Sequence, residues 1–245
     1  MTIDVVLTPA ELPALAKRDL RHTACVVFDI LRATSTFVTA LQNGATAIIP
    51  VGEITDALQI KKKRPEVLLG GERHGVKIRA EGIDFDFGNS PREYTPEKAA
   101  GKTIVSTTTN GTRALRACAG ANTVLASAFL NLSATAKFLR DKNFTNVLVV
   151  CAGTGENAAL EDILAAGALC QKFSSDQTTF TDSALTALAT FDAAKGDVAA
   201  AASQSENARR LLGIPELRDD VKFCLQQDTL NFVAALKGDA IQIFS

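Results

Sequence analysis

The chain has 245 residues, enough for one large hydrophobic core or two modest ones, with 47% apolar and 22% charged residues. That composition is typical of a globular protein and excludes a wholly disordered chain. Its 26 basic and 27 acidic residues give a formal net charge of -1, so no basic surplus exists to neutralise a nucleic-acid backbone.

Short apolar runs rich in Val and Ile alternate with amphipathic stretches through most of the chain. The apolar runs predict buried strands at residues 3–7, 24–30, 47–51, 67–69, 103–106, 124–126 and 147–151. Helical patterns lie at about residues 34–43, 54–63, 112–117, 132–141 and 158–173. Alternating strands and helices imply βαβ units, so we predict an α/β fold with three α/β/α layers and a mostly parallel, mixed sheet.

Two regions depart from this alternation. Residues 70–96 are rich in Gly and Pro among charged residues and predict a long loop or irregular excursion, a kind of segment that is usually functional. Beyond residue 173 the chain is rich in Ala and Ser, which predicts a helix at about 183–212, another at 217–227 and a last strand at 240–244. Without a repeat or a Pro/Ser linker, we expect one domain over residues 1–245, helix-rich from about residue 174.

The five cysteines are scattered, and none forms a CxxC pair, as is typical of reduced thiols in a cytosolic protein. The chain begins without the pattern of a secretory signal, and no apolar run approaches the roughly 18 residues that span a bilayer. We therefore expect a soluble, cytoplasmic protein with neither nucleic-acid nor membrane partners.

The first candidate site segment follows the second predicted strand. Asp29 ends that strand, and Arg32, Thr34 and Ser35 follow where a helix begins. A strand-end carboxylate can hold a divalent metal, while the arginine and the hydroxyls can bind phosphate oxygens. Alternatively, Thr34 or Ser35 caps the helix and Asp29 is a turn residue, although that leaves Arg32 unexplained. Leu31 occupies the position where a haloacid-dehalogenase-type phosphatase needs a second Asp, which disfavours that mechanism.

A Thr-rich segment forms the second candidate. Several hydroxyls, then Asn-Gly, precede a predicted helix, and they form a set of donors suited to an anion. The alternative is a Thr-rich strand with an Asn-Gly turn and a Thr cap. The candidate anion-binding residues are Thr108, Thr109, Asn110, Gly111 and Thr112.

The third candidate lies after the strand at 147–151. Gly153 allows close backbone approach to a ligand, and Glu161 and Asp162 lie in the first turn of a helix. Adjacent helical side chains point about 100° apart, so we expect one of these carboxylates to face the site. Alternatively, both simply complement the helix dipole.

The irregular segment adds Glu72, Arg73, Asn89 and Ser90. Glu72 follows an apolar strand, where a site carboxylate is expected, and Arg73 could bind an anion or only pair with Glu72. His74, a lone loop histidine, is expected at the surface. Because the candidate ligands are carboxylates and hydroxyls, with no HExxH or CxxC pattern, they favour Mg²⁺ over zinc.

Five motif blocks together resemble the 2-phosphosulfolactate phosphatase family. They occur in the expected order across most of the first 165 residues: DxxRATST at 29–36, GGER at 70–73, FDxGNSPxEY at 85–94, TTTNGT at 107–112 and CAGxxG with ALED at 151–162. The segment after residue 173 matches only loosely.

This resemblance implies a Mg²⁺-dependent phosphoric monoester hydrolase that converts 2-phosphosulfolactate to sulfolactate and phosphate, as in coenzyme M biosynthesis. Its partner would be a small anionic phosphate ester, with a homodimer left open beside a monomer. Asp29, Glu72, Glu161 and Asp162 are then the candidate catalytic residues, with Asp29, Glu72 and Asp162 as metal ligands. Because the substrate carries three acid groups, Arg32, Arg73 and Arg92 are expected to help bind it.

Two other functions remain open. One is a phosphatase for another small phosphorylated 2-hydroxy acid, and the other is a non-catalytic, anion-binding homologue. All three readings require polar segments far apart in the chain to meet at one edge of the sheet, with Asp29, Glu72 and Asn110 in one cavity.

Overall fold

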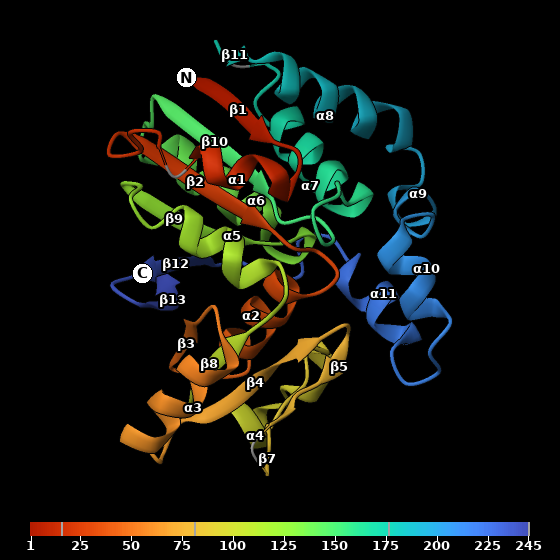
Figure 1. Cartoon of the computed structure of the whole chain (residues 1–245). Helices are drawn as coiled ribbons and strands as arrows, with labels where there is room; N and C mark the ends of the chain where they lie inside the picture. The colour runs from red at the N-terminus through yellow and green to blue at the C-terminus, as the bar shows by residue number, and fades with distance from the viewer. Residues whose placement is uncertain (16, 81, 176, 245) are drawn as a thin grey trace.

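The computed structural model describes residues 1–15, 17–80, 82–175 and 177–244. Strands in this described part form an 11-stranded sheet in the order β11-β1-β10-β2-β9-β12-β13-β3-β8-β4-β5 (Figure 1). Most neighbouring strands are parallel and helices flank the sheet, so the predicted α/β fold with a mixed, mostly parallel sheet is confirmed.

One parallel block occupies the first half of the sheet. Its strands in spatial order are β1 (Thr2–Val6), β10 (Asn146–Cys151), β2 (Thr23–Phe28) and β9 (Thr123–Ser127). Val27 of β2 lies between Val150 of β10 and Ala126 of β9. Both of its neighbours and Val27 itself are buried, as expected for a parallel sheet covered on both faces.

A second parallel block lies on the other side of a C-terminal hairpin. The block consists of β3 (Ala47–Pro50), β8 (Thr103–Thr107) and β4 (Leu68–Arg73). In the hairpin, β12 (Val233–Lys237) pairs antiparallel with β13 (Ala240–Phe244). On its other side β12 pairs antiparallel with β9, and β13 pairs antiparallel with β3. The last strands of the chain therefore join two blocks that are built from its earlier part.

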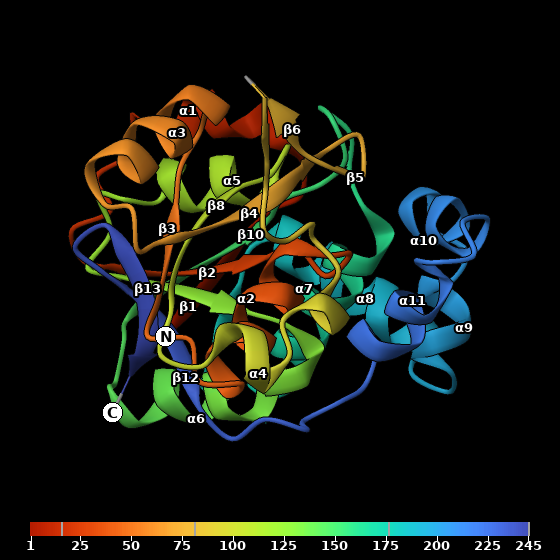
Figure 2. The ribbon, with the colours of Figure 1, turned by 90° about the horizontal axis from the view of Figure 1, so that it is seen from below.

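Helices lie on both sides of the strands. Figure 2 shows α1 (Leu12–Leu15), α3 (Ile54–Lys63) and α5 (Gly111–Ala117) on one side. The other side carries α2 (Ala33–Gln42), α4 (Pro96–Ala99), α6 (Leu132–Asp141) and α7 (Leu160–Gln171). This arrangement agrees with the expected α/β/α layers.

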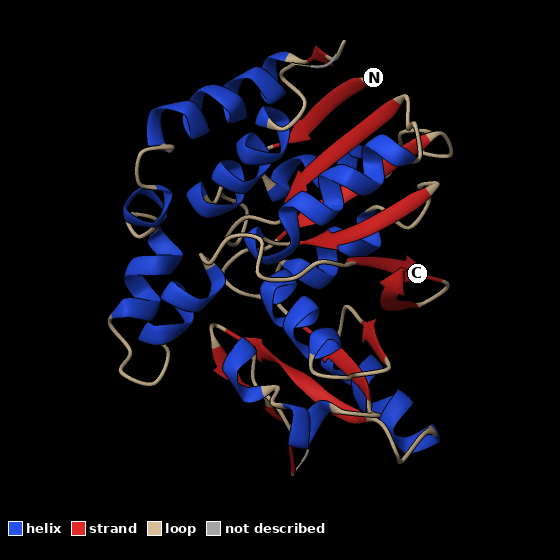
Figure 3. Cartoon of the chain, turned by 180° about the vertical axis from the view of Figure 1, so that it is seen from behind, coloured by secondary structure: helices blue, strands red, loops and turns tan. Residues whose placement is uncertain are grey.

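The C-terminal part is helical, but the single helix expected at 183–212 is wrong. Three helices replace it: α8 (Asp182–Ala194), α9 (Val198–Ala202) and α10 (Glu206–Leu212). Asp197 and Ser205 accept hydrogen bonds from Ala200 N and Ala208 N, so each caps a new helix where a continuous one was predicted. A further helix, α11 (Arg218–Cys224), follows, and α9 to α11 stand beside the layered body (Figures 1 and 3).

Residues 70–96 form an irregular excursion, as expected. Glu72 and Arg73 continue β4, after which come only short elements: β5 (Val76–Lys77), β6 (Arg79–Ala80), β7 (Ile83–Asp84) and the 3₁₀ turn η2 (Pro91–Glu93). Two further short 3₁₀ turns, η1 (Pro9–Glu11) and η3 (Phe129–Asn131), lie elsewhere.

Sequence analysis missed the strands β11 (Thr179–Phe180) and β12. Among the described residues, none of the helices combines the length and apolar character needed to cross a membrane.

Candidate active site

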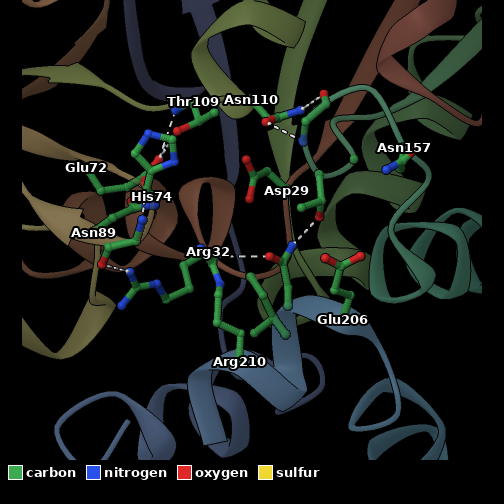
Figure 4. Close-up of a pocket in the computed structure, with 16 residues that line it drawn as sticks. Asp29, Arg32, Glu72, His74, Asn89, Thr109, Asn110, Asn157, Glu206 and Arg210 are labelled. Atoms are coloured by element: carbon green, nitrogen blue, oxygen red, sulfur yellow. Dashed lines mark hydrogen bonds between the residues drawn. The ribbon is translucent and has the colours of Figure 1, made fainter. Parts of the chain in front are cut away.

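A cavity of about 390 Å³ lies where the two parallel blocks and α10 come together. The ends of β2, β4, β8 and β10 each contribute to its wall, and α10 closes one side (Figure 4). Asp29, Glu72 and Asn110 all line it, as the spatial expectation required. The complete lining is Asp29, Leu31, Arg32, Glu72, His74, Gly75, Asn89, Thr109, Asn110, Gly153, Thr154, Gly155, Asn157, Glu206, Asn207 and Arg210.

Asp29 lies directly after β2 and points into the middle of this cavity (Figure 4). Its Oδ1 accepts a hydrogen bond from Ala33 N at 3.0 Å. Burial, together with the negative charges of Glu72 and Glu161, raises the pKa of Asp29 to about 7, although the Ala33 hydrogen bond and Arg32 oppose the rise. A positive charge added to the cavity would therefore favour the ionised form of Asp29.

Gly111 does not line the cavity, but its missing side chain leaves room for Asp29. A Cβ added at Gly111 would come within 2.6 Å of both Asp29 Oδ2 and Ala33 Cβ. The start of α5 can approach the carboxylate this closely only because residue 111 is glycine.

Thr34 and Ser35 lie outside the cavity lining and are buried. Thr34 Oγ1 donates to Asp29 O at 3.0 Å, and Ser35 Oγ donates to Ile30 O at 2.8 Å. Both hydroxyls therefore hold the first turn of α2 against the end of β2, rather than facing a ligand.

Arg32 lines the cavity although its side chain is only 3% exposed. Its Nη1 donates to Asp220 Oδ2 at 2.8 Å and its Nη2 to Gly75 O at 3.2 Å. Arg73 does not line this cavity and donates instead to Glu72 O and to Thr107 Oγ1. Of these two arginines, only Arg32 is placed to meet a ligand in the cavity.

Glu72 links the end of β4 to the Thr-rich turn after β8. Its Oε1 accepts from Thr109 N at 2.8 Å and from Thr109 Oγ1 at 2.9 Å, and its Oε2 accepts from Gly75 N at 2.6 Å. The carboxylate is thus fixed in orientation while it lines the cavity.

The Thr-rich turn divides into residues that face the cavity and residues that cap α5. Thr109 and Asn110 line the cavity. Thr112 N donates to Thr108 Oγ1 and Thr112 Oγ1 donates to Thr108 O, so that pair stabilises the helix start. Asn110 Nδ2 donates to Ala152 O at 2.8 Å, which ties this turn to the segment containing Gly153.

Glu161 and Asp162 are both buried, and neither lines the cavity, so the expectation that one faces it is not met. Asp162 accepts hydrogen bonds from Ile30 N at 2.8 Å and from Gly153 N at 2.9 Å, which joins the loops after β2 and β10. Glu161 Oε1 accepts from Asn207 Nδ2 at 3.0 Å, and its Oε2 has no hydrogen-bond partner among the described residues. Burial raises the pKa of both carboxyls.

Asn89 lines the cavity, and Ser90 lies behind it. Asn89 Oδ1 is buried and has no hydrogen-bond partner in the part of the chain that the structure describes, whereas Ser90 Oγ donates to Asp220 Oδ1 at 2.7 Å. Arg92 also pairs on the outer side, with Asp219 and Asp220, rather than in the cavity.

Comparison with known proteins identifies the family. A model described as 2-phosphosulpholactate phosphatase matches residues 7–239. The chain belongs to the 2-phosphosulfolactate phosphatase family. Membership makes it a phosphatase, that is, a phosphoric monoester hydrolase.

Several bacterial family members align over nearly their whole length. The chain is 42% identical over 231 residues to a probable 2-phosphosulfolactate phosphatase of Caldanaerobacter subterraneus, covering 92% of each chain. It is 39% identical to a probable 2-phosphosulfolactate phosphatase of Thermotoga maritima, covering 96% of this chain and 95% of the relative. A probable 2-phosphosulfolactate phosphatase of Clostridium perfringens is 34% identical, with 99% and 96% covered.

Within this 2-phosphosulfolactate phosphatase family member, the cavity includes residues that sequence reasoning missed. His74 is exposed, as expected, yet it also lines the cavity. The contribution of α10 was not anticipated, because its residues were predicted as part of one long helix rich in Ala and Ser. The missed residues are Leu31, His74, Gly75, Thr154, Gly155, Asn157, Glu206, Asn207 and Arg210.

Proposed function

We propose that this chain hydrolyses 2-phosphosulfolactate to sulfolactate and phosphate with the help of Mg²⁺. The observation that carries the proposal is the single cavity in which Asp29, Arg32, Glu72 and Asn110 meet, although the first and last of them lie in different parallel blocks. The names of the aligned relatives point to the same substrate.

The charges around the cavity favour a bound cation. Arg32 and Arg210 face three carboxylates, those of Asp29, Glu72 and Glu206. A multiply charged anion entering this lining would meet more negative than positive charge. Burial is the main cause of the raised pKa of Asp29, and the negative charge of Glu72 adds to it. A divalent cation would reverse that balance.

The donor set fits Mg²⁺ held by few protein ligands. The described residues contain no group of three or more His, Cys, Asp or Glu side chains arranged to hold a metal. Mg²⁺ usually binds through one or two carboxylates and completes its shell with water and phosphate oxygens. Asp29 and Glu72 are the carboxylates on our proposed metal side of the cavity. Asp162 instead joins the loop after β2, which carries Asp29, to the loop after β10. A bound ion would supply charge neutralisation at the phosphoryl group.

The remaining lining residues suggest how the ester lies. Arg32, whose charge acts on Asp29, would bind phosphoryl oxygens there, and Thr109 and Asn110 would contact the ester as part of the same cavity lining. Arg210 and Asn207, on α10, would bind the sulfonate and carboxylate of the organic part. In the reaction, the oxygen of a water molecule bonds to phosphorus as the bond from phosphorus to the ester oxygen breaks. The released ester oxygen takes up one proton of that water and becomes the hydroxyl of sulfolactate, while the other proton stays with the phosphate.

The five cysteines are free and buried, which fits a reducing compartment such as the cytoplasm. We include a cytoplasmic location in the proposal. We also propose that the sulfolactate produced is used in coenzyme M biosynthesis.

The decisive experiment measures phosphate release with and without Mg²⁺ across a panel of phosphorylated 2-hydroxy acids. Wild-type protein should release phosphate fastest from 2-phosphosulfolactate and only with the metal present. Asp29→Asn, which keeps the size of the side chain and removes its charge, should lower kcat by roughly 100-fold or more.

Asp197→Asn is a suitable control, because Asp197 caps α9 away from the cavity. Full Mg²⁺-dependent activity in Asp29→Asn would disprove its assigned role. Faster phosphate release from another acid in the panel would identify that acid as the substrate instead of 2-phosphosulfolactate. Binding of the esters without phosphate release would show that the protein is a non-catalytic, anion-binding homologue.

A further inference from the structure

Asp220 of α11 connects the C-terminal helices to two walls of the cavity. Its side chain is 0% exposed and its Oδ2 accepts from Arg32 Nη1 at 2.8 Å. Its Oδ1 accepts from Ser90 Oγ at 2.7 Å and lies 3.7 Å from Arg92 Nη1. Asp220 itself does not line the cavity, so it has no direct part in the proposed reaction.

The contact with Asp220 determines how Arg32 is oriented. A guanidinium is a planar group with five N–H donors in a fixed arrangement. Asp220 holds Nη1, and Gly75 O, 3.2 Å from Nη2, holds the other end. Two anchors on one plane stop the group from rotating, while Arg32 still forms part of the cavity wall.

Through its contact with Ser90, Asp220 also holds the loop that forms a second wall of the cavity. Ser90 follows Asn89, which lines the cavity and whose buried Oδ1 bonds to none of the described residues. The backbone oxygen of Asn89 accepts from Thr36 Oγ1 at 2.8 Å, so α2 fixes this loop from the other side. Asp220 and Thr36 together hold Asn89 in place before any ligand arrives.

We propose that Asp220 is a positioning residue that presets Arg32 and Asn89 to bind the phosphoryl group. Helix α11 is therefore needed for anion binding, although it contributes no side chain to the cavity lining. The identity of the bound group rests on the proposed function, whereas the orientation of Arg32 does not.

A purely electrostatic role and a positioning role for Asp220 predict opposite changes in anion binding when its carboxylate is removed. Removing a negative charge beside Arg32 would, by electrostatics alone, make the cavity more positive and tighten anion binding. Loss of positioning would instead weaken binding, because Arg32 would no longer be held in the correct orientation. The sign of the change separates the two roles.

The test compares Asp220→Asn with Asp219→Asn by calorimetry with inorganic phosphate in the presence of Mg²⁺. Asp219 is the adjacent, exposed carboxylate, 3.4 Å from Arg92, so its variant loses the same charge without touching Arg32. We expect Kd for phosphate to rise by about 10- to 100-fold in Asp220→Asn and to stay near the wild-type value in Asp219→Asn. Unchanged or tighter binding in Asp220→Asn would overturn the proposal.

Reactivity of Arg32 toward phenylglyoxal, followed by peptide mass analysis, gives a readout that needs neither turnover nor binding. Arg32 should be protected in wild type and in Asp219→Asn, and modified in Asp220→Asn, with the exposed Arg21 as an internal reference. Equal protection of Arg32 in all three proteins would refute positioning. Phosphate binding without ester hydrolysis by the wild type would refute the proposed function alone.

Asp220→Glu provides a second variant if Asp220→Asn does not fold. It keeps the charge and displaces the carboxylate by one methylene. Weaker phosphate binding and faster modification of Arg32 are expected, and wild-type values for both would show that only the charge matters.

Discussion

Arg32 and Arg210 face the cavity from distant parts of the chain, and they are held in different ways. Arg32 is paired with a buried carboxylate. Arg210 donates through Nη2 to Asn207 Oδ1 at 3.1 Å and forms no ion pair with a described carboxylate. A Cβ added at Gly75 would lie 3.3 Å from Arg210 Nη1, so the guanidinium packs against that glycine. The charge of Arg210 opposes the rise in the pKa of Glu161, but no described carboxylate pairs with the guanidinium directly, so it can still bind an anionic ligand.

This difference predicts a selective effect of Arg210→Ala. Competitive inhibition by sulfolactate should weaken by roughly 10-fold or more, because a charge-assisted hydrogen bond is lost. Inhibition by inorganic phosphate, which occupies the Asp29 side of the proposed site, should change little. Arg209→Ala is the control, since Arg209 does not line the cavity. Equal weakening for both inhibitors would contradict a separate role for Arg210.

The sequence identified the strand ends that carry site residues better than it identified the direction of each side chain. Asp29, Arg32, Glu72, Asn89, Thr109, Asn110 and Gly153 line the cavity. Predicted partners such as Ser35 and Thr112 instead bond to nearby backbone. A hydroxyl at a helix start serves equally well as a cap or as a ligand donor, so residue type and spacing alone do not separate these roles.

At the scale of elements, Asp4 shows how one side chain joins strand β1 to the start of α8 and to Arg18, which follows α1. Asp4 Oδ1, on β1, accepts from Thr181 Oγ1 at 2.9 Å and from Ser183 Oγ at 3.0 Å, at the start of α8. Its Oδ2 pairs with Arg18 Nη1 at 3.0 Å. Burial alone would raise the pKa of Asp4, but the hydrogen bonds from Thr181, Arg18 and Ser183 outweigh it and lower the pKa below 3.8.

Because its folded-state pKa is lowered, Asp4 contributes stability above the unfolded pKa and loses it as the pH falls through the folded value. Asp4→Asn should therefore lower the free energy of unfolding by about 1 kcal/mol at pH 7. The difference from wild type should shrink as the pH falls below 3.8. Urea unfolding at a series of pH values measures both effects. A difference between Asp4→Asn and wild type that stays constant across the pH series would exclude the linkage.

Elements that depend on local pattern could be predicted, and those that depend on distant partners could not. The Val-rich strands of the first block were recognisable because both faces are buried. The residues of β12, Val233–Lys237, include two alanines and a lysine and have no strand pattern of their own. Pairing with β9 and β13 makes them a strand, and those contacts are invisible in the local sequence.

At the scale of the whole molecule, the cavity is an interface between separately built parts. Asp29 and Gly153 come from one parallel block, Glu72 and Thr109 from the other, and Arg210 from the C-terminal helices. A ligand that contacts all three parts should oppose their separation. Sequence analysis anticipated the meeting of the two blocks, but the reach of α10 depends on packing between segments that have no shared local pattern.

Mg²⁺ and inorganic phosphate together should therefore raise the thermal unfolding midpoint. Ligand at 100 times its Kd adds about 2.7 kcal/mol to the free energy of unfolding. Differential scanning calorimetry of wild type and Asp29→Asn, each with phosphate alone, Mg²⁺ alone and both, measures this linkage. The combined increase should be largest in wild type and nearly absent in Asp29→Asn. A similar increase in both proteins would mean that the ligands bind elsewhere.

The position of the β12–β13 hairpin in the middle of the sheet has a consequence for synthesis of the chain. A nascent polypeptide that has not yet released residues 233–244 from the ribosome lacks the strands that separate β9 from β3. Two incomplete sheets then expose unpaired edges, which readily pair with other chains. The fold therefore depends on residues 233–244 to cover these edges, and this segment must leave the ribosome before the edges find another partner.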